Sequence, residues 1–80
     1  MNIGMLWFDN DPKIDLKQKI ERAASYYRSK YGQTPNVCFV HPSMVHNSPT
    51  KTGVIDVRPN RAVRPNHFWL GINGSEHAAT

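Results

Sequence analysis

The pattern of hydrophobic and polar positions changes period along the first part of the chain. Residues 3–8 are nearly all apolar, which predicts a strand buried on both faces. Over residues 12–31 the apolar positions follow a helical period and form one stripe, made of Leu16, Ile20, Ala23, Ala24, Tyr27 and Tyr31. We expect Asp11 to cap this helix, with Pro12 in its first turn and Gly32 at its end.

Three further segments have the character of strands. Residues 36–41 form a second apolar run, so strand, helix and strand follow each other as a βαβ unit with parallel strands and a right-handed crossover. Residues 42–52 are polar and predict a loop. Residues 53–58 and 67–72 alternate between apolar and polar positions, and we expect them to form a hairpin.

These elements predict the α+β class. We expect two layers: a mixed sheet of about four strands, in the order β-α-β-β-β, and one main helix on one face. Residues 1–72 form a single small domain in this interpretation, and residues 73–80 form a frayed polar tail.

One helix is too narrow to cover both faces of such a sheet. The first two strands carry apolar side chains on both sides, so the face away from the helix should expose an apolar patch. Residues 42–52, a second copy of the chain or another protein would then cover it. A symmetric homodimer is the commonest arrangement and is our expectation.

The charge of the chain favours acidic partners. Ten Lys and Arg residues against six Asp and Glu give a net charge of +4, and the sequence pI is about 9.6. The positive charge is concentrated in residues 13–30 and 51–67. This balance is typical of proteins that bind nucleic acid or another polyanion.

The cysteine and acidic residues limit other chemistries. A single cysteine, Cys38, excludes an internal disulfide and a Cys₄ zinc site, which favours a cytoplasmic protein; no signal peptide or membrane span is predicted. Asp9 and Asp11 follow the first strand, but the only other carboxylate considered for Mg²⁺, Asp56, is distant in sequence. We therefore expect neither a metal nor a cofactor, and interpret both aspartates as turn and cap residues.

The most unusual motif is a repeated Arg-Pro-Asn tripeptide at residues 58–60 and 64–66, with Arg61 midway. In a polyproline conformation, with three residues per turn, Arg58, Arg61 and Arg64 would line one edge. Such a row of guanidinium groups suits phosphates or carboxylates. The alternative is a solvated hairpin loop in which Pro-Asn simply makes turns.

Two other groups are candidates for nucleic-acid contact. On the helix, a flank of Lys19, Arg22, Tyr26 and Lys30 interleaves basic and aromatic residues; its simpler interpretation is solvated surface. On the last strand, Trp69 and His67 should share a sheet face with Asp56 and Arg58. In one interpretation Trp69 is exposed beside an Arg and stacks on a base. In the other it lies in the core or in a subunit interface.

The leading hypothesis is a non-enzymatic basic module that binds nucleic acid or another polyanion. Its predicted contacts are Lys51, Arg58, Arg61, Arg64, His67, Trp69, Lys19, Arg22 and Lys30. The second hypothesis is a homo-oligomeric protein-interaction module that uses the apolar sheet face. The third is a small ribonuclease that uses histidines among His41, His46 and His67 for acid–base catalysis, although no spacing fixes the geometry it needs.

Overall fold

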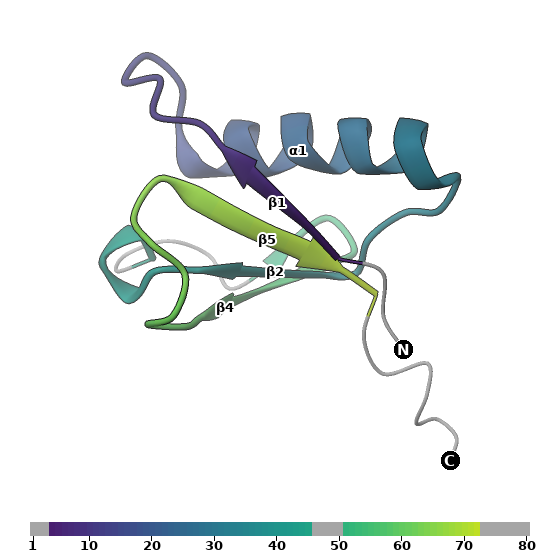
Figure 1. Cartoon of the computed structure of the whole chain (residues 1–80). Coiled ribbons are helices and arrows are strands. Elements are labelled where there is room, and N and C mark those ends of the chain that lie inside the picture. The colour runs from purple at the N-terminus through teal and green to yellow at the C-terminus, as the bar shows by residue number, and fades with distance from the viewer. Residues whose placement is uncertain (1–3, 46–50, 73–80) are drawn as a thin grey trace.

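A single helix packs on one face of a five-stranded mixed sheet in the computed structural model, which describes residues 4–45 and 51–72 (Figure 1). In chain order the elements are β1 (Gly4–Phe8), α1 (Leu16–Tyr31), β2 (Val37–Val40), the 3₁₀ turn η1 (Pro42–Met44), β3 (Lys51–Thr52), β4 (Ile55–Pro59) and β5 (His67–Gly71). The α+β class and its two layers are therefore confirmed. The expected frayed tail, residues 73–80, lies outside the described residues.

The strands lie in the order β1-β5-β2-β4-β3. Strand β5 is antiparallel to both β1 and β2, and β2 is parallel to β4. The predicted parallel direction of β1 and β2 is therefore confirmed, with β5 lying between them. The predicted hairpin is wrong, because β2 separates β4 from β5. The central position suits β5, since Phe68 and Leu70 are fully buried there.

The hairpin in this fold joins β3 to β4. Thr52 pairs with Ile55, which leaves Gly53 and Val54 as a two-residue turn. Gly53 has a φ of 60° at the first turn position, where a type II′ turn requires glycine. Strand β3 has only two residues, too few for alternation to reveal it in the sequence.

The helix begins at Leu16 because Asp15, and not Asp11, caps it. The carboxylate of Asp15 accepts from the backbone N–H of Gln18 at 2.9 Å, and the Gln18 side chain accepts from the backbone N–H of Asp15 at 3.3 Å. This reciprocal capping box needs Glu or Gln three residues after the cap, whereas Asp11 has Ile14 there. Asp11 instead makes a local turn, and the predicted start of the helix is corrected by four residues.

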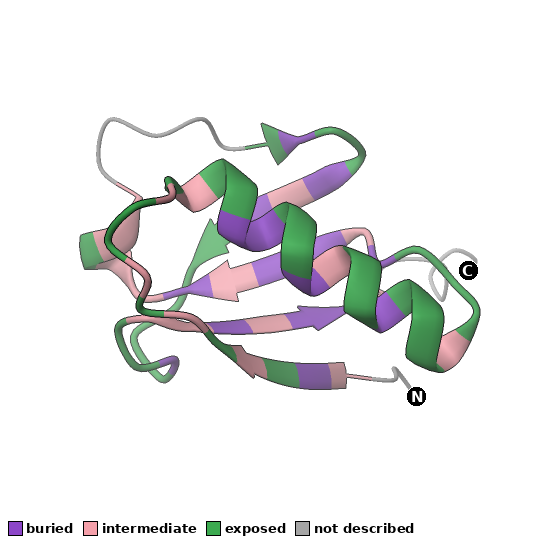
Figure 2. Cartoon of the chain, turned by 90° about the horizontal axis from the view of Figure 1, so that it is seen from above, coloured by how far each residue is buried: buried purple, intermediate pink, exposed green. Residues whose placement is uncertain are grey.

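The core lies between α1 and the sheet (Figure 2). The predicted stripe on α1 is confirmed: Ile20, Ala23 and Tyr27 are fully buried, and Leu16, Ala24 and Tyr31 pack against the core. From the sheet, the core receives Met5, Cys38, Val40, Ile55, Val57, Phe68 and Leu70. The helix also ends as predicted, because Gly32 has a φ of 74° and its N–H donates to the carbonyl of Arg28.

Burial of Cys38 predicts a specific loss of stability in alkali. The thiol is fully buried, and burial raises its pKa from the ordinary 9.0 to about 12. Below pH 9 the thiol is protonated in both folded and unfolded chains. Between pH 9 and 12 only the unfolded chain ionises, so the free energy of unfolding falls as pH rises, by at most about 1.4 kcal/mol per pH unit from this group.

Urea denaturation of the wild type and Cys38→Ala at a series of pH values from 8 to 10.5 measures this contribution. Cys38→Ala should be less stable at pH 8, because a buried group is lost, but its stability should decline less steeply above pH 9. Parallel declines for the two proteins would contradict the raised pKa.

Candidate functional site on the open sheet face

The sheet face opposite α1 is called the open face, and its side chains come from alternate residues of each strand. They are Leu6, Phe8, Phe39, Val37, Lys51, Asp56, Arg58, His67 and Trp69. The register pairs Leu6 with Trp69, Trp69 with Phe39, and Phe39 with Arg58. These four residues therefore form a row across β1, β5, β2 and β4, with neighbouring strands about 4.8 Å apart. The predicted shared face of Trp69 and Arg58 is confirmed, although β2 lies between their strands.

Large apolar side chains remain accessible on the open face. Leu6 is 62% exposed and Phe8 is 56% exposed, while Phe39 and Trp69 are half-buried. The rings of Phe39 and Trp69 are 5.7 Å apart and tilted by 51°. The Trp69 indole lies over Gly4, where any Cβ would collide with it. The expected apolar patch is thus present, with its aromatic part held in a fixed arrangement.

Of residues 42–52, which were expected to cover this face, only Lys51 is described on it, at the β3 edge, and residues 42–45 lie elsewhere. Met44 and Val45 pack against the buried core, and residues 46–50 lie outside the described residues. The segment that borders the open face is instead the connection between β4 and β5, where Val63 is buried.

This connection, residues 60–66, starts with a tight turn. The N–H of Val63 donates to the carbonyl of Asn60 at 3.1 Å, and the Asn60 side-chain oxygen accepts from the N–H of Ala62 at 2.8 Å. The N–H of Asn60 itself donates to the carbonyl of Val40 at 2.7 Å, which ties the turn to the end of β2. Asn60 therefore holds this turn at both its side chain and its backbone.

A second turn follows at once. The N–H of His67 donates to the carbonyl of Arg64 at 3.1 Å, with Pro65 and Asn66 between them. Asn66 has a φ of 66°, and Pro followed by a residue of positive φ is typical of a type II turn. The carbonyl of Asn66 also accepts from Asp9, which ties this turn to the end of β1.

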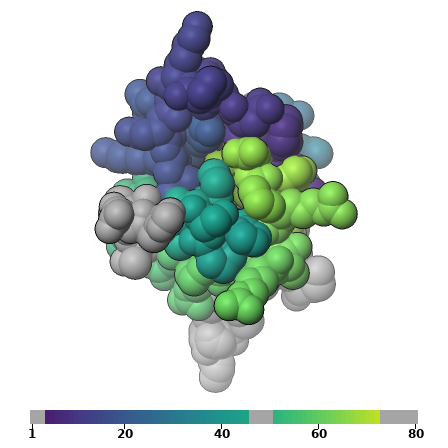
Figure 3. All heavy atoms as spheres, turned by 90° about the vertical axis from the view of Figure 1, so that its left-hand side faces the viewer, coloured from purple at the N-terminus to yellow at the C-terminus, as the bar shows by residue number. Residues whose placement is uncertain are grey.

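The two turns correct one prediction and confirm only part of its alternative: Pro-Asn makes turns, but the connection does not close a hairpin. The Arg-Pro-Asn repeat is not an extended polyproline segment, and Arg58, Arg61 and Arg64 do not line one edge of it. Proline and asparagine make turns because proline fixes its own φ and asparagine tolerates positive φ. Arg58 lies on β4, while Arg61 and Arg64 lie in different turns, and all three are exposed. Figure 3 shows the 9–15 segment, the residues that follow β2 and the 60–66 connection together at this end of the molecule.

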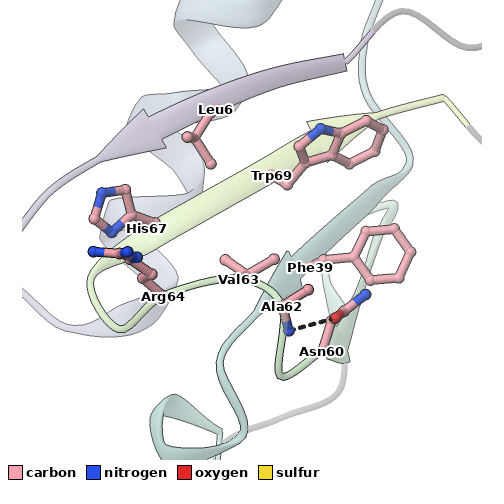
Figure 4. Close-up of a pocket in the computed structure, with 8 residues that line it drawn as sticks. All are labelled: Leu6, Phe39, Asn60, Ala62, Val63, Arg64, His67 and Trp69. Atoms are coloured by element: carbon pink, nitrogen blue, oxygen red, sulfur yellow. Dashed lines mark hydrogen bonds between the residues drawn. The ribbon is translucent and has the colours of Figure 1, made fainter.

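A hollow of about 680 Å³ lies between the row and the connection. Its lining is mostly apolar, from Leu6, Phe39, Ala62, Val63 and Trp69, with Asn60, Arg64 and His67 as polar members. Figure 4 shows Arg64 and His67 side by side at one end, and the rings of Trp69 and Phe39 at the other. The volume is in the range of small-molecule sites in proteins. The hollow thus joins an aromatic surface to a cationic end.

The charges around this hollow are mainly positive. Asp56 lies between two cations, 3.5 Å from Lys51 Nζ and 3.6 Å from the Arg58 guanidinium. All three side chains are substantially exposed, so these ion pairs are weak and yield readily to another anion. Among the described residues, Arg61 and Arg64 have no ion pair. The open face therefore keeps a net positive charge.

Both described histidines have local structural roles. His67 Nδ1 is 3.0 Å from the carbonyl oxygen of Pro65, which only accepts, so Nδ1 is the donor, and its ring is 4.9 Å from the Phe8 ring. His41 Nδ1 accepts from the N–H of Ser43 and caps η1. No contact within residues 4–45 and 51–72 pairs the two imidazoles, and His46 lies outside these residues.

The helix cations belong to a different surface. Since α1 covers the opposite face of the sheet, Arg22 and Lys30 cannot share a small ligand with the open-face residues (Figure 1). The Arg22 guanidinium is 3.9 Å from Asp9, and Lys30 lies over the Tyr31 ring. Lys19 is only 7% exposed, so its placement on an exposed flank was wrong. It adjoins the buried stripe, where a long aliphatic stem packs well.

Sequence reasoning predicted an apolar patch and Trp69 but did not name Leu6, Phe39, Asn60 or Val63 as site residues. Leu6 and Phe39 were interpreted only as parts of apolar strands, and Asn60 and Val63 only as loop residues. Alternation along the first two strands does place Leu6 and Phe39 on one face. Their alignment with Trp69 depends on β5 lying between β1 and β2, which no local pattern encodes.

Comparisons of the chain with protein-family models, curated proteins and solved structures gave no match. The described helices include none that is long and apolar enough to span a membrane. Within residues 4–45 and 51–72, no three His, Cys, Asp or Glu side chains form a group that would hold a metal ion.

Proposed function

We propose that this chain is a non-enzymatic module that binds single-stranded nucleic acid on its open face. The observation that carries the proposal is the row of Leu6, Trp69, Phe39 and Arg58 beside a hollow with Arg64 at its end. Each part of this arrangement corresponds to one chemical part of a nucleotide.

The aromatic part suits bases. Trp69 and Phe39 are half-buried, so their orientation is fixed by packing while part of each side chain stays accessible. A base gains about 1–3 kcal/mol by stacking on such a side chain, with little dependence on sequence. Paired bases in a duplex are already stacked on their neighbours, so the proposal specifies single strands.

The cationic part suits phosphates. Arg64 lines the hollow, Arg58 ends the row, and Lys51 lies on the same face. A strand whose base lies against Trp69 would place its flanking phosphates among these cations. The polyanion alternative uses the same cations but has no need of the aromatic rings, so Trp69 distinguishes the two.

Replacing Arg64 by alanine, together with Arg61 in the neighbouring turn of the same connection, tests the role of the cations at this side of the hollow. We expect weaker binding for every oligonucleotide sequence tried, because interactions with phosphates carry no sequence information. The slope of log affinity against log salt should fall by up to about 1.4, or about 0.7 for each phosphate that the variant no longer neutralises. Fluorescence anisotropy with a labelled single strand at several salt concentrations measures both.

The matched control is Arg22→Ala with Lys30→Ala, which removes the same charge from the helix side. It should change affinity and salt slope less than the Arg61 and Arg64 pair. Equal effects of the two double variants would show that only net charge matters and would contradict a site on the open face.

The proposal as a whole is tested by comparing one labelled oligonucleotide as a single strand and as a duplex at low salt. We expect tighter binding of the single strand. Equal affinity for both forms would indicate a general polyanion binder, and the absence of any complex at low salt would remove the proposed function.

A further inference from the structure

Among residues 4–45 and 51–72, strand β1 lies at one edge of the sheet and pairs only with β5. It is the first strand in the order β1-β5-β2-β4-β3, and its residues, GMLWF, include no charge and no proline. Proteins commonly place charged residues or proline on an exposed edge strand, because an unprotected edge accepts another strand. The opposite edge, β3, has only two residues and carries Lys51. Strand β1 is therefore a better surface than β3 for pairing with another strand.

The backbone groups that point away from the sheet on β1 can be assigned. Asp9 donates its N–H to Asn66, its partner in the extended β1–β5 register. Hydrogen-bonded pairs alternate along an antiparallel ladder, so Met5 and Trp7 also face β5. The backbone groups of Gly4, Leu6 and Phe8 then face outward, on the side where another strand would pair.

We propose that a second copy of the chain pairs with β1 in antiparallel register, about a two-fold axis at Leu6. Leu6 then pairs with Leu6 of the second copy, and Gly4 pairs with Phe8 of the second copy. Each pair is of the hydrogen-bonded type, because these are the outward-facing backbone groups.

The side chains make a second copy the fitting occupant. Phe8, the larger end of the strand, meets Gly4, which has no side chain, and on the open face the Phe8 ring approaches the Trp69 indole that lies over Gly4. Leu6 and Phe8, 62% and 56% exposed in one chain, become covered in both. No charged residue lies on the strand, so no like charges meet across the axis.

This pairing does not require the proposed function, although it contacts Leu6 and Trp69 at one end of the same row. It depends on backbone hydrogen bonds and apolar contact, so it should persist at high salt and without nucleic acid, where nucleic-acid binding is lost. A dimer that binds no oligonucleotide, or a monomer that binds one, would separate the two ideas.

Cross-linking through Leu6→Cys tests the register. Hydrogen-bonded partners across an antiparallel ladder have Cα atoms about 5.5 Å apart, within the range that a disulfide spans. We expect Leu6→Cys to form a covalent dimer rapidly under mild oxidation at high salt. Phe8→Cys, which faces Gly4 and not its own copy, should cross-link slowly, as should Val54→Cys on the turn at the other edge. The native Cys38 is buried and does not compete.

Sedimentation of the reduced proteins completes the test. The wild type should have twice the chain mass of 9.1 kDa, Leu6→Lys should be a monomer, and Val54→Lys, altered at a residue that is 66% exposed, should remain a dimer. A monomeric wild type at its highest soluble concentration would overturn the proposal. A dimer that Leu6→Lys leaves intact, or equal cross-linking at positions 6 and 54, would place the contact elsewhere and overturn it too.

Discussion

Replacing Trp69 by alanine is expected to weaken binding of a single-stranded oligonucleotide by about 5- to 150-fold, the equivalent of the 1–3 kcal/mol that one stacked base contributes. The indole is half-buried between Gly4 and Phe39, so it presents its surface to a ligand without first having to be ordered. Fluorescence anisotropy at fixed salt gives the ratio of dissociation constants. Trp69→Phe should retain most of the affinity, because it keeps an aromatic ring at the same position.

The control for this prediction is Trp7→Phe. Trp7 lies on the helix side of β1, next to Tyr26, and its indole nitrogen is buried without a hydrogen-bond partner among the described residues. Its replacement therefore removes no hydrogen bond and leaves the open face intact. Circular dichroism establishes that each variant is folded. Wild-type affinity in a folded Trp69→Ala variant would show that bases do not stack on the open face.

Replacing Phe68 by alanine is expected to lower the free energy of unfolding by about 3–5 kcal/mol. Phe68 is fully buried on the central strand β5, and it pairs with residues of both β1 and β2. A small domain has a total of only about 5–15 kcal/mol, so this single change removes much of its stability. Urea denaturation measures the decrease.

Two further variants keep this prediction testable even where Phe68→Ala does not fold. Phe68→Leu retains most of the apolar volume and should be destabilised less than the alanine variant. Val54→Ala, at an exposed turn position, should stay within about 0.5 kcal/mol of the wild type. A decrease below about 1 kcal/mol for Phe68→Ala would contradict its place at the centre of the core.

The elements of this fold were predictable because their signals are local. The stripe on α1, the glycine at its end and the alternation along β4 and β5 each depend on residues a few positions apart. The order of the strands is not local. The 60–66 connection is long enough to carry the chain past β2, so a hairpin and the observed arrangement leave the same short-range pattern.

The site was predictable in its chemistry and not in its geometry. Charge and an exposed tryptophan identified Arg58, Arg64 and Trp69 as candidates, and the structure places all three on or beside the open face. The Pro-Asn sequence is compatible both with an extended arginine row and with two turns. The positive φ of Asn66 decides for the turns, and the sequence does not reveal that angle. Lys19 was predicted on an exposed flank, but a lysine at the border of an apolar stripe either extends into solvent or packs its aliphatic stem against the core, and the sequence pattern is the same in both cases.

The most direct test of binding on the open face is the fluorescence of Trp69 alone. The chain has two tryptophans, so Trp7→Phe leaves Trp69 as the single indole. Titration of this variant with an unlabelled single strand at low salt should quench its emission to saturation, and added salt should reverse the quenching. Emission that stays unchanged while an anisotropy measurement reports bound oligonucleotide would place the contact away from Trp69 and contradict this account.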